Sequence, residues 1–225
     1  MSGRPKPVIL VSGLPRSGTS MIMQMLEAGG VEILCDGERA ADEDNPKGYY
    51  ELEAVKGTKD DPSWLDGARG KAVKLISQLL YDLPEGTPCK VIFLRREMGE
   101  ILASQRKMLE RRGGGGAEGD GDSDVEDAEM SRIFETHLTE VLAWAKQRSG
   151  LELLEVWHAE VLRDSARVAA EIERFLGLVL DVSAMGATVD GGLHRNRAAG
   201  VTAEDYMDAD EEEAVAKRLR DLGYL

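Results

Sequence analysis

Residues 8–20 read Val-Ile-Leu-Val-Ser-Gly-Leu-Pro-Arg-Ser-Gly-Thr-Ser, and this short stretch decides the fold. The apolar run at 8–11 is typical of a strand that is buried on both faces. Gly13 and Gly18 then frame a turn whose backbone N–H groups can converge on an anion at the N-terminus of the next helix. The stretch therefore predicts a phosphate-binding loop between a strand and a helix, with the spacing of a P-loop.

One residue of this loop departs from the pattern of the nucleoside triphosphatases. Those proteins carry Lys directly after the second glycine, where its ammonium group reaches the β- and γ-phosphates. Here that residue is Thr19, and Arg16 is the only cation in the loop. We therefore expect the loop to hold an anion with Arg16 and backbone N–H groups.

The rest of the chain alternates apolar runs with segments of helical periodicity. Further strands are expected at residues 31–35, 71–76, 90–94 and 151–157. This alternation predicts an α/β fold of the P-loop type, in three layers, with a central, mainly parallel β-sheet flanked by helices. Ligands of such sheets bind at the carboxyl ends of the strands. His137 falls among apolar positions of one helical segment and is expected in the core.

Length and composition favour one globular domain. The chain has 225 residues, 42% of them hydrophobic, which suffices for one α/β domain with a sizeable core. Residues 113–129 differ from the rest, because they hold seven acidic residues, no Lys or Arg, and almost nothing apolar. We expect a single domain over residues 1–225, with a disordered acidic, Gly-rich insert at 113–129.

Charge and cysteine content limit the partners. A net charge of −14 argues against nucleic acid or an anionic membrane as the main partner. Cys35 and Cys89 are too few and too far apart in sequence to suggest a disulfide framework or a zinc site. No apolar run approaches the roughly 20 residues of a membrane span, and the N-terminus lacks a signal-peptide core. A soluble, cytoplasmic protein is therefore expected, with a locally positive pocket for an anion.

Two arginines stand where a kinase would place a metal ligand. P-loop kinases and GTPases usually have an Asp at the end of a neighbouring apolar strand, where it helps to hold Mg²⁺. The strand at 91–94 ends in Arg95 and Arg96 instead. Because arginine can donate two parallel hydrogen bonds to phosphate oxygens, two phosphate groups could be held without a metal. The groups available for this are Arg16, Arg96 and the hydroxyls of Ser17, Thr19, Ser20 and Ser104.

The pattern Pro-Arg-Ser-Gly-Thr-Ser at 15–20, with Arg96 and then Ser104 eight residues later, resembles the sulfotransferases that use 3′-phosphoadenosine 5′-phosphosulfate (PAPS). The resemblance is particularly to the bacterial sulfotransferase-domain proteins and covers most of the chain outside the insert. It extends through residues 45–51, Lys74, the strand before His158, residues 175–177 and residues 193–197.

This resemblance implies where PAPS would bind. The loop, with Arg16, Ser17, Gly18, Thr19 and Ser20, would bind the 5′-phosphosulfate end. Arg96 and Ser104 would bind the 3′-phosphate. Arg195 and Arg197 could close over the 3′-phosphate or pair with surface acids.

The resemblance also implies a reaction, the in-line transfer of a sulfuryl group from PAPS to a hydroxyl or amine of a small-molecule acceptor, with no metal. Arg16 is assigned to the leaving oxygen, and Lys74 has a supporting role. Many cytosolic relatives use a His two residues after that Lys, but this chain has Ile76 there. Other branches use a carboxylate after the second strand, so Glu51 is the first choice for the base and Glu38 the second.

Two other functions stay open from the sequence. One is a P-loop nucleotide or small-molecule kinase, against which the missing Lys and the missing acidic strand end both count. The other is an inactive module that binds adenosine 3′,5′-bisphosphate (PAP), the product that PAPS leaves behind.

Overall fold

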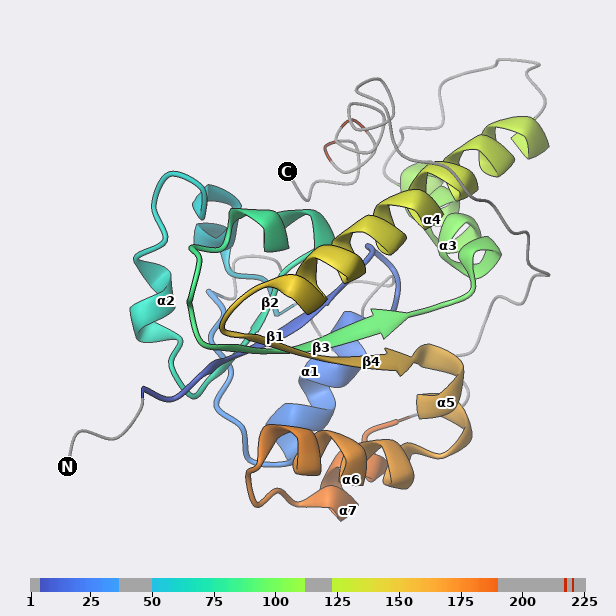
Figure 1. Cartoon of the computed structure of the whole chain (residues 1–225). Coiled ribbons are helices and arrows are strands. Elements are labelled where there is room, and N and C mark those ends of the chain that lie inside the picture. The colour runs from blue at the N-terminus through green and yellow to red at the C-terminus, as the bar shows by residue number, and fades with distance from the viewer. Residues whose placement is uncertain (1–4, 37–49, 112–122, 190–216, 218–219, 221–225) are drawn as a thin grey trace.

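The computed structural model describes residues 5–36, 50–111, 123–189, 217 and 220. In this part of the chain, four parallel strands form one sheet in the order β2-β1-β3-β4 (Figure 1). The strands are β1 (Val8–Gly13), β2 (Ala72–Lys74), β3 (Cys89–Arg95) and β4 (Leu151–Trp157). The expected α/β class with a parallel central sheet is confirmed.

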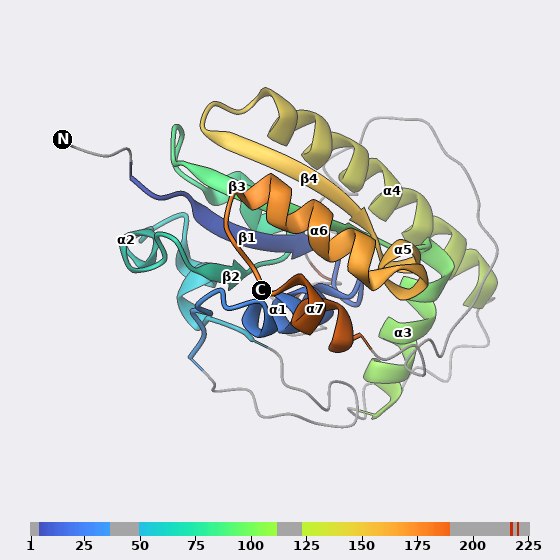
Figure 2. The same ribbon diagram turned by 90° about the horizontal axis from the view of Figure 1, so that it is seen from below.

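Helices cover both faces of this sheet. Figure 2 looks onto the face that is covered by α1 (Thr19–Ala28), α5 (His158–Arg163), α6 (Ser165–Leu176) and α7 (Val182–Ala187). The other face carries α3 (Met98–Arg111), α4 (Ser123–Gln147), the short α2 (Trp64–Gly67) and the 3₁₀ turns η1 (Glu53–Gly57) and η2 (Ser77–Asp82). The described chain therefore has the three layers that the alternating pattern predicts.

Strand β1 is buried on both faces, as its apolar run predicts. Val8 and Leu10 pack into the core on the α4 side, whereas Ile9 and Val11 pack into the core on the α1 side. Because side chains alternate across a strand, only a continuous apolar run can supply both cores. This central strand therefore fixes the position of the loop that follows it.

Two of the expected strands differ from the structure. Residues 31–35 do not form a strand, because only Ile33 pairs there, as an isolated bridge to Ala72. Two hydrogen bonds join this segment to the sheet edge. The backbone nitrogen of Ala72 donates one of them and its backbone oxygen accepts the other, and the chain then turns away. Strand β2 is shorter than the expected 71–76, because the chain enters η2 directly after Ile76.

Helix α4 begins at Ser123, inside the range 113–129 where the composition predicts an insert. Residues 123–129 are thus helical, and residues 113–122 lie outside the described residues. Acidic residues are favourable at the N-terminal end of a helix because of its dipole. In the described ranges, none of the helices combines the length and apolar character that crossing a bilayer requires.

His137 lies in the core on α4, where the apolar pattern places it, and only 2% of it is exposed. Its Nε2 atom is 2.9 Å from Ser77 Oγ, and its ring meets Tyr81 edge-on. Burial lowers the pKa of His137 from 6.5 to about 4, because the charged imidazolium loses its hydration there. The folded chain therefore keeps this imidazole neutral.

The pKa of His137 predicts a loss of stability in mild acid. Between pH 6.5 and about 4 the unfolded chain binds a proton that the folded chain rejects, so the free energy of unfolding falls as the pH falls. The slope is about 1.4 kcal/mol per pH unit in that window, or roughly 3 kcal/mol near pH 4. Urea unfolding at pH 7, 6 and 5 measures this slope of the unfolding free energy.

The double variant His137→Leu/Ser77→Ala is the control, because it removes both polar partners from the core. Its unfolding free energy should lack this part of the acid slope. An equal slope in both proteins would assign the loss to other groups.

Candidate functional site

The loop between β1 and α1 curls at the carboxyl end of the sheet through three residues of positive φ. These are Gly13 at 149°, Arg16 at 73° and Gly18 at 105°. A Cβ atom on Gly13 would lie 2.6 Å from Ser17 Oγ and 2.7 Å from the Leu94 carbonyl oxygen, so only glycine fits there. The glycine frame therefore folds the loop tightly against the end of β3.

Two features of the loop fit an anionic ligand. Ser17 is fully buried, and its Oγ has no hydrogen-bond partner among the described residues. Gly18 is the N-cap of α1, and no side chain caps the backbone N–H groups of this helix end. A buried hydroxyl without a partner is rare in folded proteins unless a ligand or water completes it. Thr19 and Ser20 begin the same helix.

The two expected phosphate sites meet at this loop. Arg16 Nε donates a hydrogen bond to Ser104 Oγ at 3.0 Å, although the two residues lie 88 positions apart. Arg96 Nη1 donates to the Arg16 carbonyl oxygen at 3.1 Å. The end of β3, the helix α3 and the loop are thereby joined, and they bring the guanidinium groups of Arg16 and Arg96 into one site.

Two further residues support this site without having been recognised from the sequence. Glu100 accepts a hydrogen bond from Arg96 Nε at 2.9 Å, which fixes the direction of that guanidinium group. Gln105 is fully buried, and its Nε2 donates to the Pro15 carbonyl oxygen at 3.2 Å. Arg96 and Glu100 lie only four positions apart, one just before and one within the first turn of α3, so their opposite charges are a signal that the sequence offers.

His158 closes the loop on the side of β4. It begins α5 directly after that strand, and a Cβ atom on Gly18 would lie 2.7 Å from its Cδ2 atom. The imidazole therefore packs directly on the glycine that starts α1. Any side chain at position 18 would have to displace this ring, in addition to adopting an unfavourable φ.

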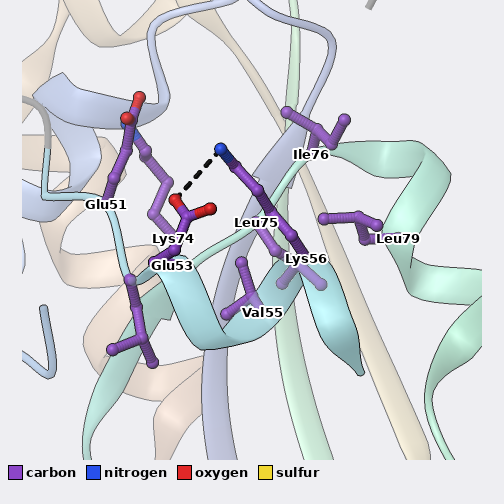
Figure 3. A pocket seen from close by; sticks show the side chains of 9 residues that line it. Glu51, Glu53, Val55, Lys56, Lys74, Leu75, Ile76 and Leu79 are labelled. Atoms are coloured by element: carbon purple, nitrogen blue, oxygen red, sulfur yellow. Dashed lines mark hydrogen bonds and ion pairs between the residues drawn. The ribbon is translucent and has the colours of Figure 1, made fainter. Parts of the chain in front are cut away.

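Lys74 and Glu51 lie together beside the loop, at the end of β2. Lys74 Nζ is 3.5 Å from Glu51 Oε1, and the Lys74 side chain is only 7% exposed. Both residues line a pocket with Ile76 and Leu79 (Figure 3). The structure therefore brings the expected supporting cation next to the first-choice base, and Ile76 stands in the same pocket.

Neighbouring segments hold Glu51 in place. The hydroxyl of Tyr50 donates to Glu27 Oε2 of α1 at 2.7 Å. The backbone oxygen of Glu51 accepts from the Asp36 nitrogen at 3.1 Å. Burial and the adjacent Glu27 carboxylate raise the pKa of Tyr50, so this phenol stays protonated and keeps its hydrogen bond.

Three of the expected site residues cannot be placed. Glu38, Arg195 and Arg197 lie outside the described residues. Among the residues that are described, no group of three or more His, Cys, Asp or Glu side chains could hold a metal ion. The site that can be built from the structure therefore consists of the loop, the side chains of Arg96, directly after β3, and of Ser104 on α3, and the Glu51–Lys74 pair.

Comparisons with known proteins bear on the fold. No family model matches the sequence, and no curated protein matches it significantly. A sulfotransferase from Mycobacterium tuberculosis is similar over 99% of this chain and 78% of that chain, at 17% identity and a TM-score of 0.55. A sulfotransferase from Mycobacterium avium is similar over 98% of this chain and 76% of that chain, at 13% identity and a TM-score of 0.50. The fold expected from the sequence resemblance is therefore confirmed.

Proposed function

We propose that this chain, which has the fold of the sulfotransferases, moves a sulfuryl group from PAPS to a hydroxyl or amine of a small-molecule acceptor. One observation carries the proposal, the hydrogen bond from Arg16 Nε to Ser104 Oγ at 3.0 Å. It joins the loop assigned to the 5′-phosphosulfate with the helix assigned to the 3′-phosphate. A site for PAPS needs two anion-binding regions that share one nucleotide, and the contact supplies this closeness.

In the proposed reaction, the acceptor oxygen or nitrogen attacks sulfur while the bond from sulfur to the 5′-phosphate oxygen breaks. PAP leaves with that electron pair, and Arg16 stabilises the charge that develops on its oxygen. Glu51 accepts the acceptor proton, and Lys74 Nζ lies 3.5 Å from its Oε1 atom. Ser17, Thr19, Ser20 and the backbone N–H groups of α1 would hold the 5′ end.

A ligand titration tests the proposal against a kinase. PAP is expected to raise the melting temperature of the chain, and ATP with Mg²⁺ is expected to raise it less. Stabilisation by ATP with Mg²⁺ and none by PAP would show that the proposed function is wrong. PAP binding without sulfuryl transfer to any acceptor of a broad panel would instead indicate an inactive module.

Arg96 is expected to recognise the 3′-phosphate. The variant Arg96→Ala should weaken PAP binding by about 10- to 100-fold, because a hydrogen bond between charged groups contributes roughly 1.5–3 kcal/mol. Binding of adenosine 5′-phosphate, which lacks the 3′-phosphate, should change far less. Isothermal titration with both nucleotides measures the difference.

Arg96 and Glu100 pair at 2.9 Å, so Arg96→Ala alone leaves the Glu100 carboxylate without its partner charge. The control therefore changes both residues. The variant Arg96→Met/Glu100→Met removes both charges. Like Arg96→Ala, it should weaken the binding of PAP far more than the binding of adenosine 5′-phosphate. Equal losses for the two nucleotides would mean that Arg96 only supports the loop through the Arg16 carbonyl.

A further inference from the structure

The pocket beside Glu51 and Lys74 has one charged side and one apolar side. In Figure 3, Glu51 and Lys74 lie at one side, and Ile76 and Leu79 lie at the other. The cavity volume is about 30 Å³, so only the reacting end of an acceptor would fit, together with the carbon atoms next to it. The chemistry of this lining therefore bears on the group that carries the accepting atom.

The charges of the described lining balance one another. Lys74 pairs with Glu51 at 3.5 Å, and Lys56 pairs with Glu53 at 3.0 Å. Two ammonium groups thus face two carboxylates, and neither sign is in excess. A neutral acceptor end meets no net charge in this pocket.

The position of Lys74 disfavours an amine as the acceptor. An amine is protonated at neutral pH, so its nitrogen has no lone pair with which to attack sulfur, and the Glu51 carboxylate that would attract it is already paired with Lys74, whose side chain is only 7% exposed. An added ammonium group would be a charge in excess of these balanced pairs, and an excess charge is unfavourable where water is largely excluded. A hydroxyl reaches Glu51 without a charge and loses its proton only as the bond to sulfur forms.

The apolar side disfavours a sugar. Ile76 is 8% exposed, Leu79 4% and Val55 6%, and none of these side chains offers a hydrogen bond. A sugar carries hydroxyl groups on the carbons next to the reacting one, and these would lose their water against the apolar wall without gaining partners. An alcohol on an apolar carbon skeleton loses no such hydrogen bonds.

We infer that the acceptor is a neutral alcohol whose hydroxyl is carried by an apolar carbon skeleton, and that Ile76 is a specificity-determining residue for it. This inference rests on the proposed function. Ile76 cannot serve as a base, as a His at this position could. Its side chain instead forms the apolar wall that would contact the carbon next to the reacting oxygen.

A matched acceptor panel tests the inference with the full chain and PAPS. The panel pairs n-butanol, n-octanol and 2-phenylethanol with the amines of the same skeletons, and adds methyl glucoside. PAP formation gives kcat/KM for each compound. At least one alcohol should exceed its matched amine and methyl glucoside by about tenfold or more, a typical discrimination for a few apolar contacts.

The variant Ile76→Thr keeps the branch at Cβ, places a hydroxyl where Ile has its Cγ1 atom, and removes the terminal Cδ1 methyl group. It should lower kcat/KM for the preferred alcohol by about tenfold, narrow its advantage over methyl glucoside, and leave PAP binding unchanged. Val179→Thr makes the same kind of change at a residue that is 99% exposed, and it should have no effect.

The outcomes separate this inference from the proposed function. Higher kcat/KM for amines or for methyl glucoside would overturn the inference and leave a sulfotransferase in place. An unchanged preference in Ile76→Thr would overturn the role of Ile76. No transfer to any compound, with PAP still bound, would contradict the proposed function, and the inference would fall with it.

Discussion

Replacing Arg16 with Gly is expected to abolish most of the turnover while leaving the thermal stability of the chain nearly unchanged. Arg16 has a φ of 73°, a conformation that costs a side-chain-bearing residue roughly 1–2 kcal/mol and glycine very little. The hydrogen bond to Ser104 that the variant loses contributes about 1 kcal/mol. The two changes nearly cancel in the free energy of unfolding.

Turnover should respond very differently, because the variant loses the cation at the leaving oxygen. Removing one such preorganised donor lowers kcat by about 10²–10³ in enzymes of other classes. The measurement is PAP formation under saturating PAPS, together with the melting temperature of the same preparation. A residue held in a costly backbone conformation at no net benefit to stability is typical of a functional site.

Arg16→Lys is the matched control, since it keeps both the charge and the cost of the positive φ. It should retain far more turnover than Arg16→Gly and have a similar or lower melting temperature. Full turnover in Arg16→Gly would show that the loop cation plays no part in the reaction. A large loss of stability in that variant would show that the side chain serves the fold.

Local features of the site could be predicted from the sequence because they depend on neighbouring residues. The apolar run of β1, the glycine-framed turn and the start of α1 all lie within residues 8–20. The sheet class followed in the same way from alternating local patterns. The strand predicted at 31–35 is wrong, because an apolar run does not reveal how many of its residues pair with a neighbouring strand. Only Ile33 forms such a pair.

Contacts between distant residues could not be derived in this way. Nothing local indicates that the Arg16 side chain turns towards Ser104, or that buried Gln105 donates to the loop at Pro15. Glu51 and Lys74 were selected through a family resemblance, and the structure places them 3.5 Å apart. Such contacts depend on how β1, β2 and α3 pack together, which a single sequence does not specify.

Replacing Glu51 with Gln is expected to lower kcat by about 10²–10⁴ and to change PAP binding by no more than about twofold. Gln has the shape of Glu and cannot take a proton from the acceptor, whereas the loop and Arg96, which are assigned to PAP, are untouched. Single-turnover transfer with PAPS in excess measures the chemical step, and isothermal titration measures the binding.

Glu53→Gln is the control for this variant, because Glu53 lines the same pocket and makes a similar ion pair, with Lys56 at 3.0 Å. Its side chain is 62% exposed, however, so water hydrates its carboxylate far more than that of Glu51, which is 23% exposed. Glu53→Gln should therefore keep kcat within a few-fold. If Glu51→Gln kept its turnover and Glu38→Gln lost it, the base would be the second carboxylate. The role of Glu51 would then be to hold the Lys74 ammonium group in a fixed direction, so that its charge points at the reacting group.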